Sequence, residues 1–160
     1  MEMTIAVFEK ICKVLDEAHA LYTVKSHAEA STSVQAARAR GLGADGVRRG
    51  AKAMILSADG KLIQCVVPGD VLVDLEKVKA LVGAKEVALA NAGDVKKATG
   101  CVPGCVPPLG NLFNLPVYAD TNLAQDMVFS AGMREKSIFM KRVDWEAVAR
   151  PIVADLAKKK

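Results

Sequence analysis

The residues best suited to chemistry gather in one stretch, Thr99–Gly110 (TGCVPGCVPPLG). It contains three glycines, three prolines and two of the four cysteines of the chain. Glycine permits backbone angles that other residues avoid, and proline fixes φ and lacks an N–H donor. The stretch therefore predicts a stiff, shaped loop, neither helix nor ladder strand. Loops of this kind present free backbone N–H and C=O groups and often carry binding sites.

Cys101 and Cys105 within this loop admit several interpretations. A structural zinc site needs four ligands, and the two histidines, His19 and His27, lie far upstream in other elements. A disulfide is disfavoured in the reducing compartment that the other two cysteines suggest, because both lie in apolar patterns of buried residues. A catalytic cysteine–histidine pair stays open, since the sequence alone does not show which residues meet. We expect no metal and no cofactor.

Nucleotide-binding motifs are absent from the sequence. Gly104 is not followed by the Gly-Lys-Ser/Thr that closes a triphosphate-binding loop. Gly41 and Gly43 supply half of a dinucleotide motif, and they follow a predicted helix where the motif requires a strand. We therefore exclude both a triphosphate loop and a dinucleotide fold.

Three polar residues outside the loop each have a structural and a functional interpretation. Lys52 stands in an apolar predicted strand, where it either points into solvent or offers its ammonium to a phosphate or carboxylate. Ser130 begins a small-residue corner that is either a turn or the polar wall of a pocket. Asp120 follows a predicted strand and is either a cap, the commoner role, or an acidic site group.

The composition is that of an ordinary globular chain, with 160 residues, 51% of them hydrophobic and 25% charged. We expect a single domain over 1–160. The net charge of +4 permits an anionic partner such as RNA without requiring one. No apolar run approaches the roughly 20 residues of a membrane helix, and the first residues lack the basic region and cleavage site of a secretion signal. We expect a cytoplasmic protein.

Hydrophobic periodicity predicts alternating helices and strands. Asp59-Gly60 indicates a hairpin, and Thr32-x-x-Gln35 fits a capping box. Asp74 and Gly83 indicate the start and the end of a helix. A last helix is expected from Asp144 through Leu156, kinked or restarted at Pro151, with the basic residues 158–160 at its end. Because strands occur in hairpins and also between helices, a mixed sheet is favoured over a doubly wound parallel one. The remaining predicted helices span 4–20, 32–39 and 94–98, and the strands 21–26, 51–57, 61–67, 85–90, 115–119, 125–131 and 136–141.

Five segments taken in order resemble a known family. They are RGAKAMIL, which contains Lys52, then PGDVLVDLEKVKALVGAKEVALA, ATGCVPGCVPPLG, LPVYAD and FSAGMREKSIFM. The chain resembles the YbaK/ProX family of aminoacyl-tRNA deacylases, freestanding relatives of the editing domain of prolyl-tRNA synthetases. The resemblance covers nearly the whole chain and is most specific in Lys52 and the loop Thr99–Gly110.

The resemblance implies a mixed α/β fold with a partly closed central sheet surrounded by helices. It implies hydrolysis of the ester that links a wrong amino acid to the 3′-terminal adenosine of tRNA, for proline tRNA or a related tRNA. Lys52 would hold the terminal adenosine or its phosphate, and backbone N–H groups at Gly104 and its neighbours would stabilise the oxyanion. Water or a substrate group would attack. The substrate-binding residues would be Thr99, Gly100, Val102, Pro103, Cys105, Pro107, Gly110, Ser130, His27 and Asp120.

The expected partners are the aminoacylated end of tRNA and, further, an aminoacyl-tRNA synthetase, with no membrane and no metal. Six basic residues near the proposed site in sequence predict a salt-dependent contact with tRNA: Arg48, Arg49, Lys52, Lys96, Lys97 and Arg134. Two alternatives stay open. One is a non-catalytic tRNA- or synthetase-binding module of the same fold, and the other is a hydrolase of small aminoacyl or acyl nucleotide esters. The amino acid that is removed is also open.

Overall fold

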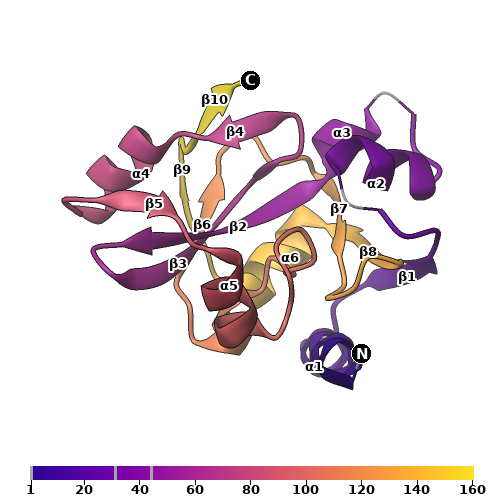
Figure 1. Cartoon of the computed structure of the whole chain (residues 1–160). Coiled ribbons are helices and arrows are strands. Elements are labelled where there is room, and N and C mark those ends of the chain that lie inside the picture. The colour runs from indigo at the N-terminus through magenta and orange to yellow at the C-terminus, as the bar shows by residue number, and fades with distance from the viewer. Residues whose placement is uncertain (1, 31, 44) are drawn as a thin grey trace.

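The computed structural model describes residues 2–30, 32–43 and 45–160 (Figure 1). Its helices are α1 (Glu2–Glu17), α2 (Ser33–Ala39), α3 (Gly46–Arg49), α4 (Leu75–Val82), α5 (Ala92–Thr99) and α6 (Arg142–Ala149), with a 3₁₀ helix at Gly110–Phe113. Its strands are β1 (Tyr22–Ser26), β2 (Ala51–Ala58), β3 (Lys61–Pro68), β4 (Val71–Val73), β5 (Val87–Leu89), β6 (Val117–Asp120), β7 (Asp126–Ser130), β8 (Lys136–Lys141), β9 (Ile152–Ala154) and β10 (Ala157–Lys159).

The central sheet has the strand order β5-β2-β3-β6-β9. β2 pairs antiparallel with β3 and β5, whereas β6 runs parallel to both β3 and β9. The predicted mixed α/β class is therefore confirmed. The sheet is open, with β5 and β9 at its edges, and lacks the partial closure that the resemblance implied.

A second, antiparallel sheet, β1-β8-β7, lies beside the central one (Figure 1). One isolated parallel bridge, between Gly50 and Val128, joins the residue before β2 to β7. A small pair formed by β4 and β10 completes the strand pairing. The bridge brings the start of β2 close to the middle of β7, two segments far apart in sequence.

Several local predictions are confirmed. Asp59 and Gly60 have φ of 50° and 83°, the paired positive angles that a two-residue hairpin requires. The Asp74 side chain accepts hydrogen bonds from the first turn of α4, which ends at the left-handed Gly83. Thr32 caps α2 by accepting from the backbone N–H of Gln35. Each of these features depends on residues adjacent in sequence, which is why the sequence predicts them.

The prediction of a long last helix is wrong. α6 spans Arg142–Ala149, so it begins before Asp144, and Arg150 leaves the helical conformation with φ 50°. Pro151 lacks an N–H and its ring clashes with the preceding turn, so the helix ends before it. The β-branched residues that follow form β9, and the predicted basic helix end lies instead in and after β10.

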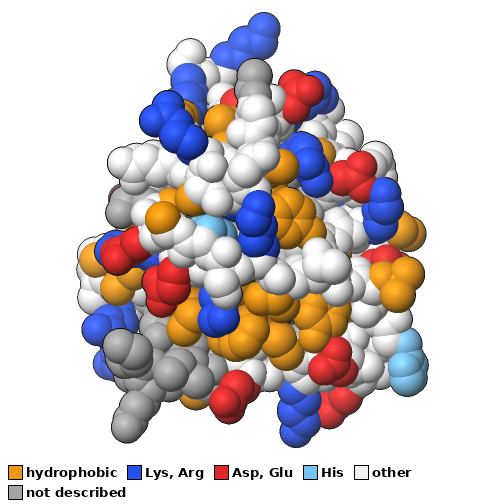
Figure 2. Space-filling view, turned by 90° about the vertical axis from the view of Figure 1, so that its right-hand side faces the viewer, with side chains coloured by type: hydrophobic (Ala, Val, Ile, Leu, Met, Phe, Trp, Pro, Cys, Tyr) orange, Lys and Arg blue, Asp and Glu red, His pale blue; other side chains and the backbone are white. Residues whose placement is uncertain are grey.

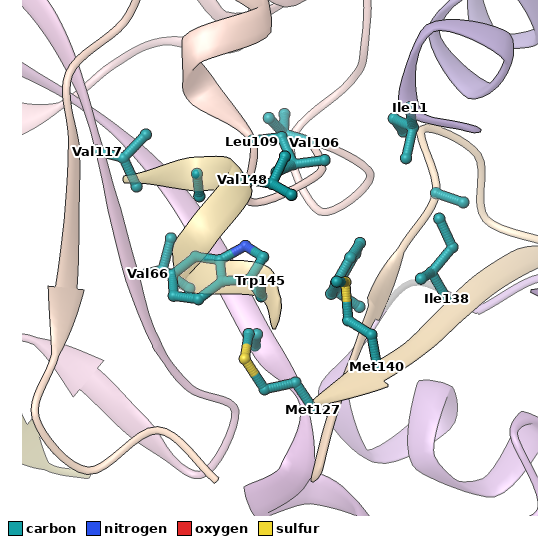
Figure 3. Close-up of a cluster of buried hydrophobic side chains, with 14 of the residues drawn as sticks. Ile11, Val66, Val106, Leu109, Val117, Met127, Ile138, Met140, Trp145 and Val148 are labelled. Carbon is teal, nitrogen blue, oxygen red and sulfur yellow. The ribbon is translucent and has the colours of Figure 1, made fainter. Parts of the chain in front are cut away.

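Two apolar clusters pack on the faces of the central sheet. The larger one joins α1, β7, β8 and α6, and Figure 3 shows the Trp145 ring between Val66 and the methionines Met127 and Met140. The smaller one lies under α4 and includes Leu56, Cys65, Val78 and Leu156. In the described part of the chain, no helix combines the length and apolar composition needed to cross a membrane.

Candidate functional site

A cavity of about 300 Å³ opens where α2, β2, the loop after α5 and the end of β7 meet. Five residues predicted from the sequence line it, namely His27, Lys52, Pro103, Gly104 and Ser130. They come from four separate segments of the chain, which the fold brings together at this cavity. Figure 2 shows the face of the molecule on the side of α2, α3 and β1, where basic side chains lie among hydrophobic ones.

Gly104 forms the exposed tip of the loop, with φ +91°. Its carbonyl oxygen accepts from the Ser130 hydroxyl at 3.3 Å. The neighbouring Cys105 N–H donates to the Val102 carbonyl at 3.1 Å, whereas the N–H groups of Gly104 and Val106 have no acceptor among the described residues. Both Gly104 and Val106 line the cavity. Two residues of the cavity lining therefore have backbone N–H groups without an acceptor among the described residues.

The ends of the loop are held by buried side chains. At its start, the Thr99 hydroxyl donates to the Val95 carbonyl at 2.7 Å and accepts from the Cys101 N–H at 3.1 Å. Further on, the Gln64 amide donates to the Pro107 carbonyl and accepts from the Gly110 N–H, each at 2.9 Å. The Trp145 indole N–H donates to the Pro108 carbonyl at 2.8 Å. This framework keeps the loop rigid.

Seven of the predicted substrate-binding residues do not line the cavity. Six belong to the loop framework: Thr99, Gly100, Val102, Cys105, Pro107 and Gly110. The seventh, Asp120, is buried, and its carboxylate accepts from the backbone N–H groups of Asn122 and Leu156. Asp120 therefore performs the capping role that was its commoner interpretation.

Lys52 lies at the start of β2 with its ammonium half-buried. The ammonium donates to the Val71 carbonyl in β4 at 2.7 Å. Burial lowers the pKa of Lys52, and the nearby Lys160 lowers it further, against the opposing effect of Asp70. An ammonium has three donors, so two remain for a ligand in the cavity.

The thiols of the loop are poorly suited to act as nucleophiles. Burial raises the pKa of Cys101 to about 11, and burial likewise raises the pKa of Cys105. A buried thiol that keeps its proton at neutral pH is a weak nucleophile. Among the described residues, no three His, Cys, Asp or Glu side chains lie together as metal ligands would.

Two polar residues of the cavity region were not singled out in the sequence. Arg40 lines the cavity, and Ser137, buried in β8, bonds both His27 and Arg40. Arg134, which the sequence placed among the basic residues near the site, also lines the cavity. Arg40 sits in an alanine-rich helix beside the exposed Arg38, so the sequence holds no signal that separates the two. Gln64 did carry a signal, because it is the one polar residue in the apolar run Leu62–Val67.

Residues 27–148 match the family model of the aminoacyl-tRNA editing domain, and the chain therefore belongs to this family. The chain is 30% identical over 110 residues to the multifunctional Ser/Thr-tRNA deacylase ProXp-y of Escherichia coli, an alignment that covers 64% of this chain and 66% of that protein. It is 35% identical over 97 residues to the proline–tRNA ligase of Caldicellulosiruptor saccharolyticus, covering 61% of this chain and 17% of the ligase.

Solved structures show the same fold. A crystal structure described as a proposed trans-editing enzyme for prolyl tRNA synthetase superposes with a TM-score of 0.81 at 24% identity, covering 95% of this chain and 97% of the other. The crystal structure of the hypothetical protein APE2540 superposes with a TM-score of 0.84 at 22% identity, covering 93% of this chain and 99% of the other. The resemblance to editing domains inferred from the sequence is thus confirmed.

Proposed function

We propose that this protein hydrolyses the ester bond of mischarged aminoacyl-tRNA as a freestanding editing enzyme, acting on proline tRNA or a related tRNA. Membership of the aminoacyl-tRNA editing family supports the substrate class. The observation that carries the proposal is Gly104, an exposed residue at the tip of a rigid loop. It lines the same cavity as Lys52, and its N–H has no acceptor among the described residues.

The chemistry needs positioning more than a strong base. Water adds to the ester carbonyl carbon, and the carbonyl oxygen becomes an oxyanion. The bond from this carbon to the ribose 3′ oxygen then breaks, and that oxygen takes a proton to leave the free amino acid and tRNA. The free N–H groups of Gly104 and Val106 would bind the oxyanion. Removing one such donor typically costs about 10²–10³ in rate.

Lys52 would bind the nucleotide end of the substrate. Its two uncommitted N–H donors can make charge-assisted hydrogen bonds, which are stronger than neutral ones. The existing bond to the Val71 carbonyl fixes where the ammonium lies before substrate arrives. A positioned cation of this kind loses less conformational entropy on binding.

The amino-acid side chain would enter a smaller hollow of about 140 Å³ that adjoins the main cavity. This hollow is lined mainly by aliphatic residues, including Ala53, Ile55, Leu89 and Val95, and it shares Pro103 and Gly104 with the main cavity. Its size favours small side chains. Apolar walls discriminate weakly against an added hydroxyl, which fits the serine and threonine named for the Escherichia coli relative.

A deacylation panel tests the proposal. Proline, serine and threonine tRNAs charged with alanine, serine, threonine, cysteine or proline are incubated with the wild type, Lys52→Ala and Lys61→Ala. Lys61 is exposed at the far end of the same hairpin and serves as the matched control. We expect at least one mischarged tRNA to be hydrolysed by the wild type and Lys61→Ala and more slowly by Lys52→Ala. Equal, background rates for all three proteins on every tRNA contradict the enzymatic function.

A further inference from the structure

Arg40, at the end of α2, is a buried cation in the wall of the cavity. Only 6% of its surface is exposed, yet no ion pair of the described residues includes it. Burying an unpaired guanidinium is costly, so such residues usually have a carboxylate partner or bind an anionic ligand. Burial lowers the pKa of Arg40 to about 10, which still leaves it charged at neutral pH.

A hydrogen-bonded chain fixes the orientation of this guanidinium. Arg40 Nε donates to Ser137 Oγ at 2.8 Å, and Ser137 Oγ lies 2.7 Å from His27 Nε2. The Ala28 carbonyl can only accept, so His27 Nδ1 carries a proton and donates to it at 2.7 Å. With the proton of a neutral ring on Nδ1, His27 Nε2 accepts from the Ser137 hydroxyl, whose oxygen accepts from Arg40 Nε. This chain of hydrogen bonds contains no carboxylate, so it supplies no negative charge to Arg40.

The terminal nitrogens of Arg40 point to the cavity. Nη1 lies beside Gly50, since a Cβ built on Gly50 would be 3.6 Å from it. Within the described part of the chain, neither Nη1 nor Nη2 makes a hydrogen bond, whereas every fully buried side-chain nitrogen or oxygen has a partner. The two nitrogens therefore contact the solvent of the cavity, with four N–H donors uncommitted.

We propose that Arg40 binds a phosphodiester of the substrate, the one that precedes the 3′-terminal adenosine, through both terminal nitrogens. The planar guanidinium matches two phosphate oxygens. An aminoacyl ester has no free carboxylate, and its amino group is cationic, so the phosphates are the anions that it brings to the cavity. This inference rests on the proposed function. It makes His27 and Ser137 positioning residues that hold Arg40, with both His27 nitrogens already occupied.

The test compares two small substrates that differ by one phosphodiester. Adenosine and the dinucleotide CpA are each esterified at the terminal 3′ hydroxyl with serine or alanine, and kcat/KM is measured for both. We expect the wild type to prefer the CpA esters by about 10- to 100-fold, the effect of charge-assisted hydrogen bonds. In Arg40→Gln this preference falls to near one, and Arg40→Lys retains part of it. Arg38→Gln, exposed on the same helix, keeps the wild-type preference.

Two further measurements separate the possible failures. Ser137→Ala keeps the charge of Arg40 but removes the hydrogen bond that orients its guanidinium. We therefore expect the preference of Ser137→Ala for CpA esters to fall, and this variant tests the site if Arg40→Gln does not fold. Binding of uncharged CpA and of adenosine is measured by calorimetry. A folded Arg40→Gln that still prefers CpA overturns the phosphodiester site while leaving the hydrolase intact. If CpA binds more tightly than adenosine and this difference depends on Arg40, but no ester is hydrolysed, the hydrolase function is overturned while the phosphodiester site at Arg40 is supported.

Discussion

The conformation of Gly104 is central at the scale of single residues. Its φ of +91° is one that residues with a side chain avoid, although a Cβ there would meet nothing within 4 Å. A side chain at this position would therefore act on the backbone angles, and so on the direction of the free N–H, without a steric clash. A substitution at Gly104 can therefore test the role of its N–H in catalysis without disturbing the packing of neighbouring side chains.

We expect Gly104→Ala to lower kcat by about 10²-fold, the effect of removing an oxyanion donor, with a small loss of stability. Gly83→Ala is the matched control, because Gly83 has φ +68°, also has open space around it, and ends α4 away from the cavity. Deacylation rates and melting temperatures are measured for both. If Gly104→Ala keeps the wild-type rate while its melting temperature falls as much as that of Gly83→Ala, Gly104 has only a structural role.

The buried loop thiols give a second prediction at this scale. Since burial raises the pKa of Cys101 and Cys105, both stay protonated at neutral pH and become reactive only as the pH rises towards the raised values. We expect iodoacetamide at pH 7 to label neither in the native protein within the time that labels both after unfolding. Mass spectrometry of the peptides measures this. If either thiol is labelled rapidly in the native protein and deacylation is lost with the labelling, the result would support a catalytic cysteine.

At the scale of elements, the loop depends on a strand residue. Gln64 in β3 holds both Pro107 and Gly110, so replacing it leaves a buried carbonyl and a buried N–H without partners. We expect Gln64→Leu, of similar size, to destabilise the fold by about 2–4 kcal/mol in urea unfolding and to slow deacylation. Gln125→Leu, at an exposed site, should do neither. A variant as stable and active as the wild type would show that the loop holds its shape without this clamp.

The elements also show how far local patterns determine structure. The hairpin at Asp59-Gly60 and the cap at Asp74 followed from the sequence because each depends on adjacent residues. The last helix did not, because the apolar residues from Trp145 to Leu156 fit helical spacing. Its outcome depended on Pro151 and on the open edge of β6, with which β9 pairs. Tertiary pairing overrode a periodic pattern at that point.

At the scale of the molecule, the sequence and its family resemblance predicted the mixed α/β class but not the cavity. The strand order β5-β2-β3-β6-β9 follows from long-range pairing that periodicity does not encode. His27, Lys52, Gly104 and Ser130 come together only because the two sheets lie beside each other at the bridge from Gly50 to Val128. Arg40 was recognised as a candidate site residue because it is buried, and its position in the sequence does not reveal this burial.

The net charge of +4 and the placement of basic residues lead to a prediction about tRNA as a whole. Lys96 and Lys97 are exposed in the last turn of α5, directly before the loop, and are placed to contact the tRNA backbone. Each phosphate contact releases counterions, so affinity falls as salt rises. We expect Lys96→Gln with Lys97→Gln to reduce the slope of log K against log salt by about 1 for each phosphate that the double variant no longer neutralises.

Lys61→Gln, far along the hairpin, leaves the slope unchanged. Uncharged tRNA binding is titrated at several salt concentrations for the three proteins. A flat response in the wild type would mean that the protein binds the terminal adenosine without using backbone phosphates. That result would also contradict the phosphodiester contact of Arg40, because a bound phosphate has to release its counterions in the same way. The salt titration thus connects the charge of the whole molecule to a single buried guanidinium.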